Sequence, residues 1–206
     1  MESPKIPDIV VSRLPLYLQT LNHLLREGKE VISSNELSER VGVPAVQIRK
    51  DLSFFGGFGK QGSGYNIIFL IDSLRGILHL NQIWPIAIVG VGNLGQALMR
   101  YQGFARQGFE IVLALDNNPH VIGTEIAGIL VRDVEEMEAE ISRLNVKIAV
   151  LTVPASVAQS TADALVSYGI RAILNYAPII LKLPAEVRVA NIDPVLKLEQ
   201  LTYYLS

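Results

Sequence analysis

The feature that most constrains the fold of this chain is a glycine motif set between an apolar run and a helical pattern. Gly90, Gly92 and Gly95 form a GxGxxG pattern at the end of the apolar run 86–91. The helical pattern NLGQALMRY begins within the motif, and Asp116 ends a second apolar run 21 residues after Gly95. A strand, a tight turn, a helix and an acid at these distances are typical of a βαβ unit that binds a dinucleotide. We therefore expect a Rossmann domain.

Each glycine of the motif has a separate physical task. Gly90 permits the tight turn, Gly92 lets the backbone approach a pyrophosphate, and Gly95 lets the helix pack against the strand. The N-terminus of that helix then faces the phosphates. A Gly-rich turn in an α/β protein that binds another ligand is the alternative interpretation. The motif residues predicted to bind the cofactor are Gly90, Val91, Gly92, Asn93, Leu94 and Gly95.

The acid at the end of the second run distinguishes between the two nicotinamide dinucleotides. Asp116 would accept hydrogen bonds from the adenine ribose hydroxyls, and its negative charge would repel a 2′-phosphate. The following Asn117 and Asn118 supply no arginine to bind such a phosphate. The sequence therefore favours NAD over NADP.

The second half of the chain alternates apolar runs with helical segments, which predicts a parallel, doubly wound sheet covered on both faces. Thr152, Val153 and Pro154 follow the fourth run, at the edge of such a sheet where ligands bind, and join the predicted cofactor site. An ordinary strand-to-helix turn with proline at the helix start explains them equally well. The runs predicted to be strands are 86–91, 110–116, 129–131, 147–152, 171–175 and 187–191.

The first half of the chain has the element order of a winged helix. Apolar spacing predicts a helix over 13–26, and Ser33 with Glu36 forms a capping box before a short second helix that ends near Val41. Pro44 suits the first position of a third helix that ends near Phe55. The stretch 58–71 is then expected to form two short strands around a Gly-rich tip, before a helix over 73–80.

These patterns divide the chain into three parts. A winged-helix domain is expected over 1–82, a Rossmann domain over 83–191 and a separate C-terminal helix over 192–206. Asp193 caps that last helix and Pro194 takes its first position. Its apolar residues Val195, Leu198, Leu201 and Leu205 share one face.

The third predicted helix carries the residues best suited to read DNA. Lys50 lies opposite the apolar face formed by Ile48 and Leu52, and Arg49 and Gln47 flank it. Arg or Lys can bind guanine in a major groove and Gln can bind adenine. A solvated amphipathic helix fits this segment alone equally well, but the capped helix before it and the hairpin after it favour DNA. The predicted DNA contacts are Gln47, Arg49, Lys50, Ser53, Lys60, Gln61, Ser63 and Tyr65.

The local charge around this helix supports an anionic partner. Arg40, Arg49, Lys50 and Lys60 face only Asp51 between residues 40 and 65. This is a modest excess of positive charge, of the kind that attracts phosphates.

Composition limits the other classes of function. Half of the 206 residues are hydrophobic and 18% are charged, which favours folded domains over disorder. There is no cysteine, no leader pattern in the first 13 residues and no apolar run of membrane-spanning length. We therefore expect a cytoplasmic protein without membrane contact.

No arrangement of residues indicates catalysis or a metal site. His23, His79 and His120 are scattered, and no metal-ligand spacing, nucleophile elbow or pair of carboxylates is visible. We predict neither catalytic nor metal-binding residues and no enzyme activity. Two alternatives stay open: a small NAD-dependent oxidoreductase with an accessory N-terminal domain, and a DNA-binding protein that binds another nucleotide, such as coenzyme A.

Taken together, several segments resemble the Rex family of redox-sensing repressors, from about Arg13 to the C-terminal helix. They are RLPLYL (13–18), QIRKDLSFFGGFGKQGSGYNI (47–67), VGVGNLGQAL (89–98), LTVPA (151–155) and NIDPVLKLEQL (191–201). The resemblance implies a homodimer that binds a palindromic double-stranded DNA operator and exchanges its C-terminal helix with the partner.

The resemblance also implies how the protein responds to redox state. NADH binding to the Rossmann domain would release the operator, and NAD⁺ would compete with NADH for the site. Residues matching Arg13, Tyr101 and Asp193 are linked near the nicotinamide in that family, which makes these three the expected switch and adds Tyr101 to the cofactor site. Our hypothesis is that NADH and DNA favour different angles between the domains, so each weakens the binding of the other by the same factor.

Overall fold

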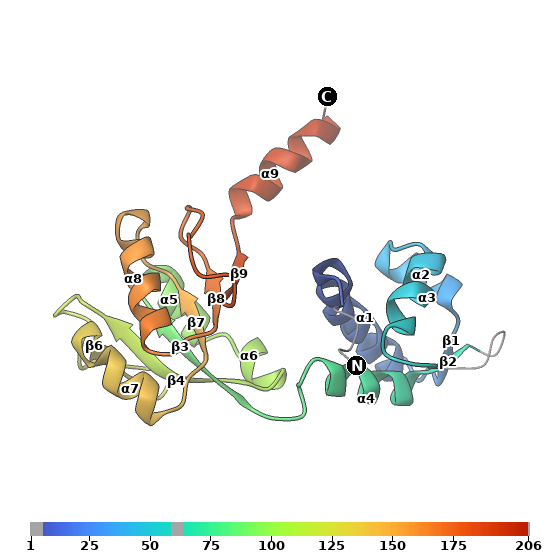
Figure 1. Cartoon of the computed structure of the whole chain (residues 1–206), viewed down its shortest axis with the longest axis horizontal. Coiled ribbons are helices and arrows are strands. Elements are labelled where there is room, and N and C mark those ends of the chain that lie inside the picture. The colour runs from blue at the N-terminus through green and yellow to red at the C-terminus, as the bar shows by residue number, and fades with distance from the viewer. Residues whose placement is uncertain (1–5, 59–63, 206) are drawn as a thin grey trace. The chain divides into compact units, whose positions relative to one another are not determined.

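The chain folds into two compact units, Met1–Gln82 and Ile83–Ser206 (Figure 1). The computed structural model describes residues 6–58 and 64–205. In this part of the chain, none of the helices has the length and apolar character needed to cross a membrane.

The N-terminal unit is mainly helical, and its helices enclose one apolar core. Leu14, Leu21, Ile48 and Leu70 are among its fully buried side chains. The first helix begins five residues before its predicted start at residue 13, because Val10 is also buried and extends the same apolar face by a turn. The elements are α1 (Asp8–Arg26), β1 (Val31–Ile32), α2 (Ser34–Val41), α3 (Ala45–Ser53), β2 (Tyr65–Asn66) and α4 (Ile67–Ile77).

The predicted caps of α2 and α3 are only partly confirmed. The Ser33 hydroxyl accepts a hydrogen bond from the backbone N–H of Glu36, as expected, but the carboxylate of Glu36 pairs with Lys29. Pro44 is the N-cap of α3, so it lies one residue before the first helical position. The third helix also ends earlier than predicted, at Ser53.

The hairpin predicted over 58–71 is wrong in the described residues, because Phe58 lies in no strand and the strand at Tyr65 and Asn66 has a different partner. Tyr65 and Asn66 form a short strand, but they pair with Val31 and Ile32 in antiparallel register. From Ile67 the chain is helical, so the helix predicted at 73–80 is the end of α4. The apolar run IIFLI suggests a strand, yet its buried residues follow helical spacing and pack into the core: Ile67, Leu70, Ile71 and Leu74.

Asn66 stabilises the start of this helix. Its side-chain oxygen accepts a hydrogen bond of 2.9 Å from the backbone N–H of Phe69, as an N-cap does. We expect Asn66→Ala to lower the free energy of unfolding by about 1 kcal/mol, while Asn66→Ser retains most of it. Urea unfolding of the two variants measures the difference, and equal stability of both would contradict the capping role.

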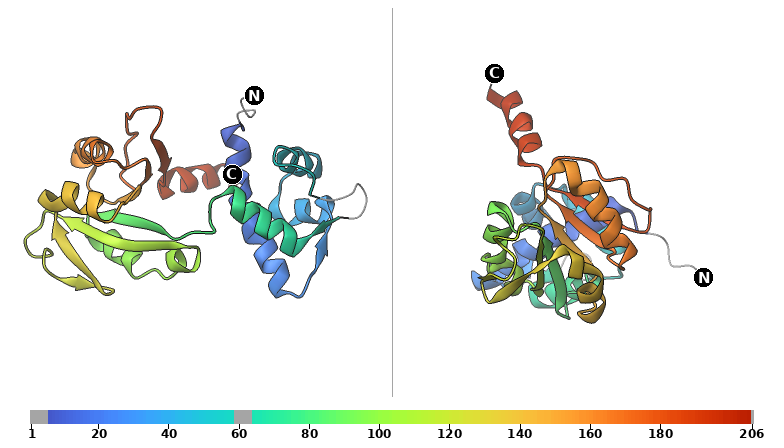
Figure 2. Two further views of the ribbon diagram at one scale, coloured as in Figure 1. Left: turned by 60° about the horizontal axis from the view of Figure 1, so that its bottom comes forward. Right: turned by 90° about the vertical axis from the view of Figure 1, so that its left-hand side faces the viewer.

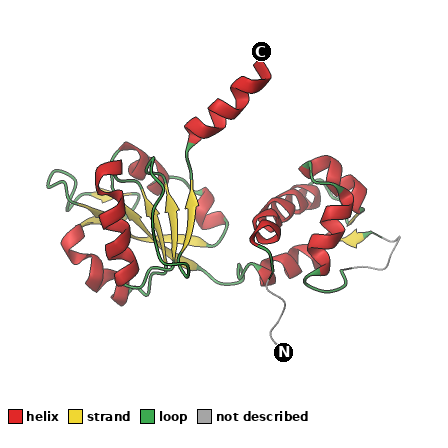
Figure 3. Cartoon of the chain, turned by 45° about the horizontal axis from the view of Figure 1, so that its top comes forward, coloured by secondary structure: helices red, strands yellow, loops and turns green. Residues whose placement is uncertain are grey.

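The second unit is built on one sheet that is almost entirely parallel (Figure 3). In the described residues the strand order is β5-β6-β4-β3-β7-β8-β9, and β5 alone is antiparallel to its neighbour. All six predicted strands are present with ends shifted by a few residues, while the short edge strand β5 was not predicted. The strands are β3 (Trp84–Val89), β4 (Phe109–Asp116), β5 (Glu125–Ile126), β6 (Ile129–Asp133), β7 (Ile148–Leu151), β8 (Ala172–Asn175) and β9 (Arg188–Asn191).

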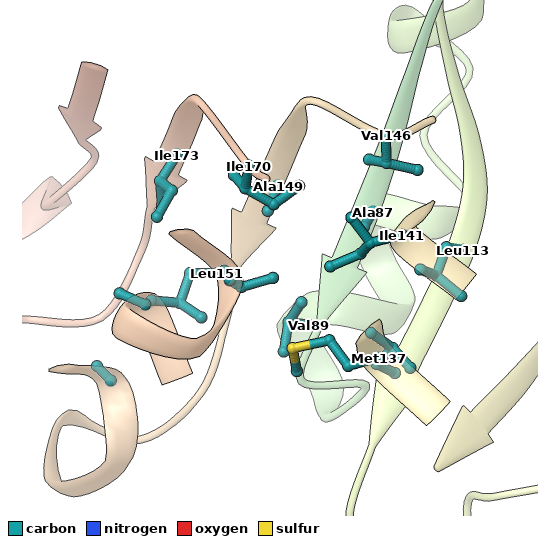
Figure 4. Close-up of a cluster of buried hydrophobic side chains, with 14 of the residues drawn as sticks. Ala87, Val89, Leu113, Met137, Ile141, Val146, Ala149, Leu151, Ile170 and Ile173 are labelled. Atoms are coloured by element: carbon teal, nitrogen blue, oxygen red, sulfur yellow. The ribbon is translucent and has the colours of Figure 1, made fainter. Parts of the chain in front are cut away.

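Helices cover both faces of this sheet, which confirms the doubly wound fold class. Ala87 and Val89 of β3 lie in the cluster formed with α7 and α8 (Figure 4), whereas Ile86 and Ile88 face the other cluster, with Met99 of α5. The helices are α5 (Asn93–Met99), α6 (Gly103–Arg106), α7 (Met137–Arg143) and α8 (Ala155–Ser167), and the 3₁₀ turn η1 (Val134–Glu136) precedes α7. Strand β3 pairs with β4 on one side and β7 on the other, so the chain reverses direction across the sheet at β3, where such folds bind ligands.

The last helix, α9 (Pro194–Thr202), extends away from the sheet of this unit (Figure 2) and is followed by η2 (Tyr203–Leu205). Asp193 caps α9 by accepting a 2.9 Å hydrogen bond from the backbone N–H of Val195, and Pro194 begins the helix, as predicted. None of its residues is buried. Its exposed apolar side chains are Val195, Leu196, Leu198 and Leu201, and Tyr203, Tyr204 and Leu205 follow in η2.

Candidate dinucleotide site and DNA-binding face

The glycine turn after β3 brings two stretches of backbone into close contact. Gly90 has a φ of +94°, and a Cβ added there would lie 2.7 Å from the carbonyl oxygen of Thr152. A Cβ added to Gly95 would overlap the carbonyl oxygen of Gly90. The fold itself therefore requires glycine at both positions.

Gly92 differs from the other two glycines. A Cβ added there would meet no atom within 4 Å, and its φ of −71° suits any residue. No described residue of the chain therefore requires glycine here, whereas a pyrophosphate that approaches the backbone would. This open space fits the group that the motif predicts.

Asp116 ties the end of β4 to the glycine turn. Its Oδ2 accepts a hydrogen bond of 2.5 Å from the backbone N–H of Val91, and its Oδ1 accepts one of 2.8 Å from that of Asn118. A carboxylate oxygen has two lone pairs, so Asp116 retains acceptor capacity for ribose hydroxyls.

A cavity of about 850 Å³ opens beside this turn, within the size range of small-molecule sites. Six of its lining residues belong to the predicted cofactor site: Gly90, Gly92, Asp116, Thr152, Val153 and Pro154. The other predicted motif residues and Tyr101 do not line it; Val91 and Gly95 are buried, and Asn93 and Leu94 are exposed at the start of α5.

Sequence reasoning missed much of the cavity wall. Asn117 and Asn118 continue the wall beyond Asp116, and Val134 and Met137 line it from the segment after β6. Helix α8 and its C-cap contribute residues that lie three or four positions apart, the repeat of one helical face, which was the available signal. They are Val157, Ser160, Thr161, Ala164 and the C-cap Tyr168.

The contrast between Gly92 and Gly95 gives a direct test of the site. We expect Gly92→Ala to keep the thermal stability of the free protein but to weaken NADH binding by about tenfold or more, since a lost hydrogen bond to a charged group costs roughly 1.5–3 kcal/mol. Gly95→Ala should lower the melting temperature of the free protein instead. Calorimetry with and without NADH separates the two effects, and unchanged NADH affinity in Gly92→Ala would show that no phosphate approaches this turn.

Tyr101 and Asp193 both lie in the second unit. Tyr101 is exposed after α5, and its ring meets that of Phe104 edge-on with centroids 5.6 Å apart. A Cβ on Gly103 would overlap the Tyr101 ring, so this glycine permits its placement. Asp193 is the partly exposed cap of α9. The expected link of these two residues to Arg13 stays a prediction.

Helix α3 presents polar side chains in the pattern expected for a DNA reader. Lys50 and Ser53 are exposed, and the Ser53 hydroxyl donates to the backbone carbonyl of Lys50. Arg49 is also exposed, and its Nη1 donates to the Ser34 hydroxyl of α2 at 2.7 Å, which steadies its side chain. Tyr65 is half-buried in β2, where burial raises its pKa and the nearby Arg49 partly offsets that shift. The predicted contacts Lys60, Gln61 and Ser63 lie outside the described residues.

Gln47 and Arg13 have a partner that was not predicted. Both bind Asp51, whose side chain is fully buried. Arg13 donates through Nε at 2.6 Å and Nη2 at 2.7 Å, Gln47 through Nε2 at 2.7 Å, and the Tyr17 hydroxyl also donates at 2.7 Å. Sequence reasoning counted Asp51 as a charge opposing the neighbouring cations. The structure makes it part of the core, beside Leu52 on the apolar side of α3.

The protonation of this group follows from its surroundings. Burial alone would raise the pKa of Asp51, but the hydrogen bonds from Arg13, Tyr17 and Gln47 outweigh it, and the pKa lies below its ordinary value. The pKa of Tyr17 is raised, first by burial and then by its bond to Asp51. The carboxylate is therefore ionised and the phenol neutral near pH 7.

Across residues 6–58 and 64–205, no group of three or more His, Asp or Glu side chains is arranged to hold a metal ion. With a helical unit that exposes Arg49 and Lys50 and an α/β unit with a nucleotide-sized cavity, the chain has the features of a DNA-binding regulator with a nucleotide-binding domain. Family models agree with this class. Residues 5–53 match "Putative DNA-binding protein N-terminus", and residues 81–179 match "CoA binding domain".

Full-length relatives identify the family. The redox-sensing transcriptional repressor Rex of Roseiflexus sp. (strain RS-1) is 50% identical over 206 residues, which cover 100% of this chain and 93% of the relative. That of Chloroflexus aggregans (strain MD-66 / DSM 9485) is 48% identical over 204 residues, covering 99% and 96%. The chain belongs to the Rex family of redox-sensing transcriptional repressors, as the sequence resemblance predicted.

Two solved structures of one Rex-family repressor resemble the whole chain. "RSP in complex with beta-NAD+ and operator DNA" has a TM-score of 0.91 and 44% identity, and covers 97% of this chain and 92% of that one. "RSP in complex with beta-NADH" has a TM-score of 0.90 and 41% identity, and covers 98% and 94%.

Proposed function

We propose that this chain is a homodimeric repressor that binds a palindromic operator and releases it on binding NADH, so that transcription follows the cellular NADH/NAD⁺ ratio. The observation that carries the proposal is the cavity at the glycine turn, with Gly92 open and Asp116 beside it, in one chain with an α3 that exposes cations. The RSP structures with NADH, and with NAD⁺ and operator DNA, support the same pair of ligands.

NADH is favoured over the other dinucleotides by charge. The negative charge of Asp116 disfavours the 2′-phosphate of NADPH. The oxidised nicotinamide ring is positive and the reduced ring is neutral, so an apolar site for this ring favours the reduced form. Tyr101 and Phe104, whose rings pack edge-on after α5 and do not line the cavity, are the aromatic groups that we assign to this ring site.

Operator recognition is assigned to α3. Lys50 and Arg49 are the charged side chains on its exposed side, suited to guanine edges or phosphates. The Ser34 contact restricts the Arg49 side chain, which lowers the entropy lost on binding DNA. Gln47 stays in the proposed interface with one amide hydrogen already donated to Asp51.

Dimer formation is assigned to α9. Leu198 is 62% exposed and Leu201 is 57% exposed. Contact of these apolar side chains with water is unfavourable, and a surface that covers them would remove this cost. A second copy of the chain that receives this helix, and gives its own in exchange, would bury both faces at once. Arg13, Tyr101 and Asp193 are the proposed switch that links NADH binding to the release of the operator. We further infer that the protein works in the cytoplasm as a regulator and not as an enzyme, since its relatives are transcriptional repressors.

The central test is a titration of operator binding. With the operator duplex of the RSP complex as probe, we expect NADH to weaken DNA binding by about tenfold or more, within the usual range of coupling free energies. NAD⁺ and coenzyme A at the same concentration should leave most DNA bound. Fluorescence anisotropy measures this, and equal effects of NADH and NAD⁺ would refute redox sensing.

A substitution in α3 tests DNA binding independently of NADH binding in this assay. Lys50→Ala should weaken operator binding while NADH binding stays unchanged, because Lys50 lies in the unit without the dinucleotide cavity. Full retention of DNA affinity would remove Lys50 from the interface.

The role of α9 gives a separate prediction. Replacing Leu198 with Asp should weaken dimer formation, because each leucine side chain buried at an interface contributes about 2 kcal/mol. Lys197→Asp changes the charge of the same helix without removing an apolar group and serves as the control. Analytical ultracentrifugation measures both, and an unchanged dimer in Leu198→Asp would exclude this helix from the interface.

A further inference from the structure

We propose that Asp51 is a positioning residue that couples Arg13 on α1 to the DNA-reading side of α3, so that a change of partner at Arg13 alters operator binding. The inference rests on the proposed function and adds one residue to it.

The Asp51 carboxylate is saturated with donors from two helices. Oδ1 accepts from Arg13 Nη2 and Gln47 Nε2, and Oδ2 accepts from Arg13 Nε and the Tyr17 hydroxyl, all within 2.6–2.7 Å. With no exposure to solvent, this charge has no water to replace a lost donor. The position of this carboxylate therefore depends on the hydrogen bonds that Arg13 and Tyr17 of α1 donate to it.

The two ends of the ion pair differ in their freedom. The Asp51 side chain is fully buried, whereas that of Arg13 is 19% exposed. A guanidinium has five N–H donors, so Arg13 can bind a further acceptor while it holds Asp51, or leave Asp51 for a stronger one. Arg13 is thus the member of the ion pair that an acceptor outside this core can bind.

Loss of Arg13 would remove two of the four hydrogen bonds to a buried charge. A buried carboxylate that loses its cationic partner is strongly destabilised where it lies, so α3 must shift or the carboxylate must find another donor. Gln47 donates to the same Asp51 oxygen, Oδ1, as Arg13 Nη2, and Lys50 precedes Asp51 on the helix. A shift of Asp51 therefore moves the residues assigned to the operator.

The test compares the antagonism of NADH and DNA in the full-length chain. For Asp51→Asn, which keeps the shape but removes the charge, operator affinity without NADH should fall about tenfold. NADH should weaken the operator binding of this variant by a factor at least five times smaller than in the wild type. The affinity of the DNA-free variant for NADH should not fall. The double variant Arg13→Ala/Asp51→Asn should show the same antagonism as either single variant, because both act through one pair.

A structural role alone gives a different result. If Asp51 only braces the fold, Asp51→Asn lowers operator affinity equally with and without NADH, and the unchanged antagonism overturns the inference. Tyr17→Phe removes one hydrogen bond but keeps the ion pair, so its antagonism should match the wild type. Glu140→Gln removes the charge of a carboxylate in the other unit, whose Oε2 lies 2.6 Å from Arg143 Nη2, and should also leave the antagonism unchanged.

A wild-type titration and a second variant distinguish failure of the proposed function from failure of the role of Asp51. Wild-type protein is titrated in parallel, and if NADH fails to release it from the RSP operator duplex, the proposed function fails. If the wild type responds and Asp51→Asn responds by the same factor, only the role of Asp51 fails. Should Asp51→Asn unfold, Arg13→Lys replaces it, since lysine keeps the charge but cannot bind both oxygens in the same fork.

Discussion

The dinucleotide cavity depends on two stretches of backbone that come closer together than a side chain would allow. Gly90 lies against the carbonyl of Thr152, and Gly95 lies against the carbonyl of Gly90. These contacts join the ends of β3 and β7, and they let α5 begin at the point where the strand order reverses and pack on the sheet. Asp116 then fastens the end of β4 to the same turn through Val91. Three neighbouring strands thus end around one opening.

The DNA-binding unit is organised around a charge instead. A buried carboxylate is unfavourable unless every oxygen has a partner, and Asp51 obtains its partners from both α1 and its own helix. Four hydrogen bonds to this one carboxylate fix how α3 lies against α1, beside the apolar core that the two helices share. The orientation of α3 is therefore tied to the ionisation of one residue.

Local patterns predicted the parts of the molecule in which neighbours along the chain decide the structure. The glycine motif, the six apolar strands and the caps at Ser33 and Asp193 all have their signals within a few residues. The strand predicted after Asn66 failed because a run rich in isoleucine satisfies both strand propensity and helical spacing, and packing on the core selected the helix.

The Asp51 network could not be predicted for a different reason. Its donors Arg13 and Tyr17 lie on another helix, so only the packing of α1 on α3 brings them together. For the same reason the cavity wall on α8 was missed, although its residues follow a regular spacing. Nothing within one helix indicates which neighbour its polar groups will meet.

The uncovered helix α9 has a consequence for the cell. In the proposed dimer, a partner chain covers Leu196, Leu198 and Leu201, so the stability of the protein would grow with its own concentration. Assembly from two chains depends on the square of their concentration, whereas degradation of lone chains depends on the first power. Slow synthesis would therefore yield little dimer, and a modest increase in expression would raise the dimer concentration more than in proportion.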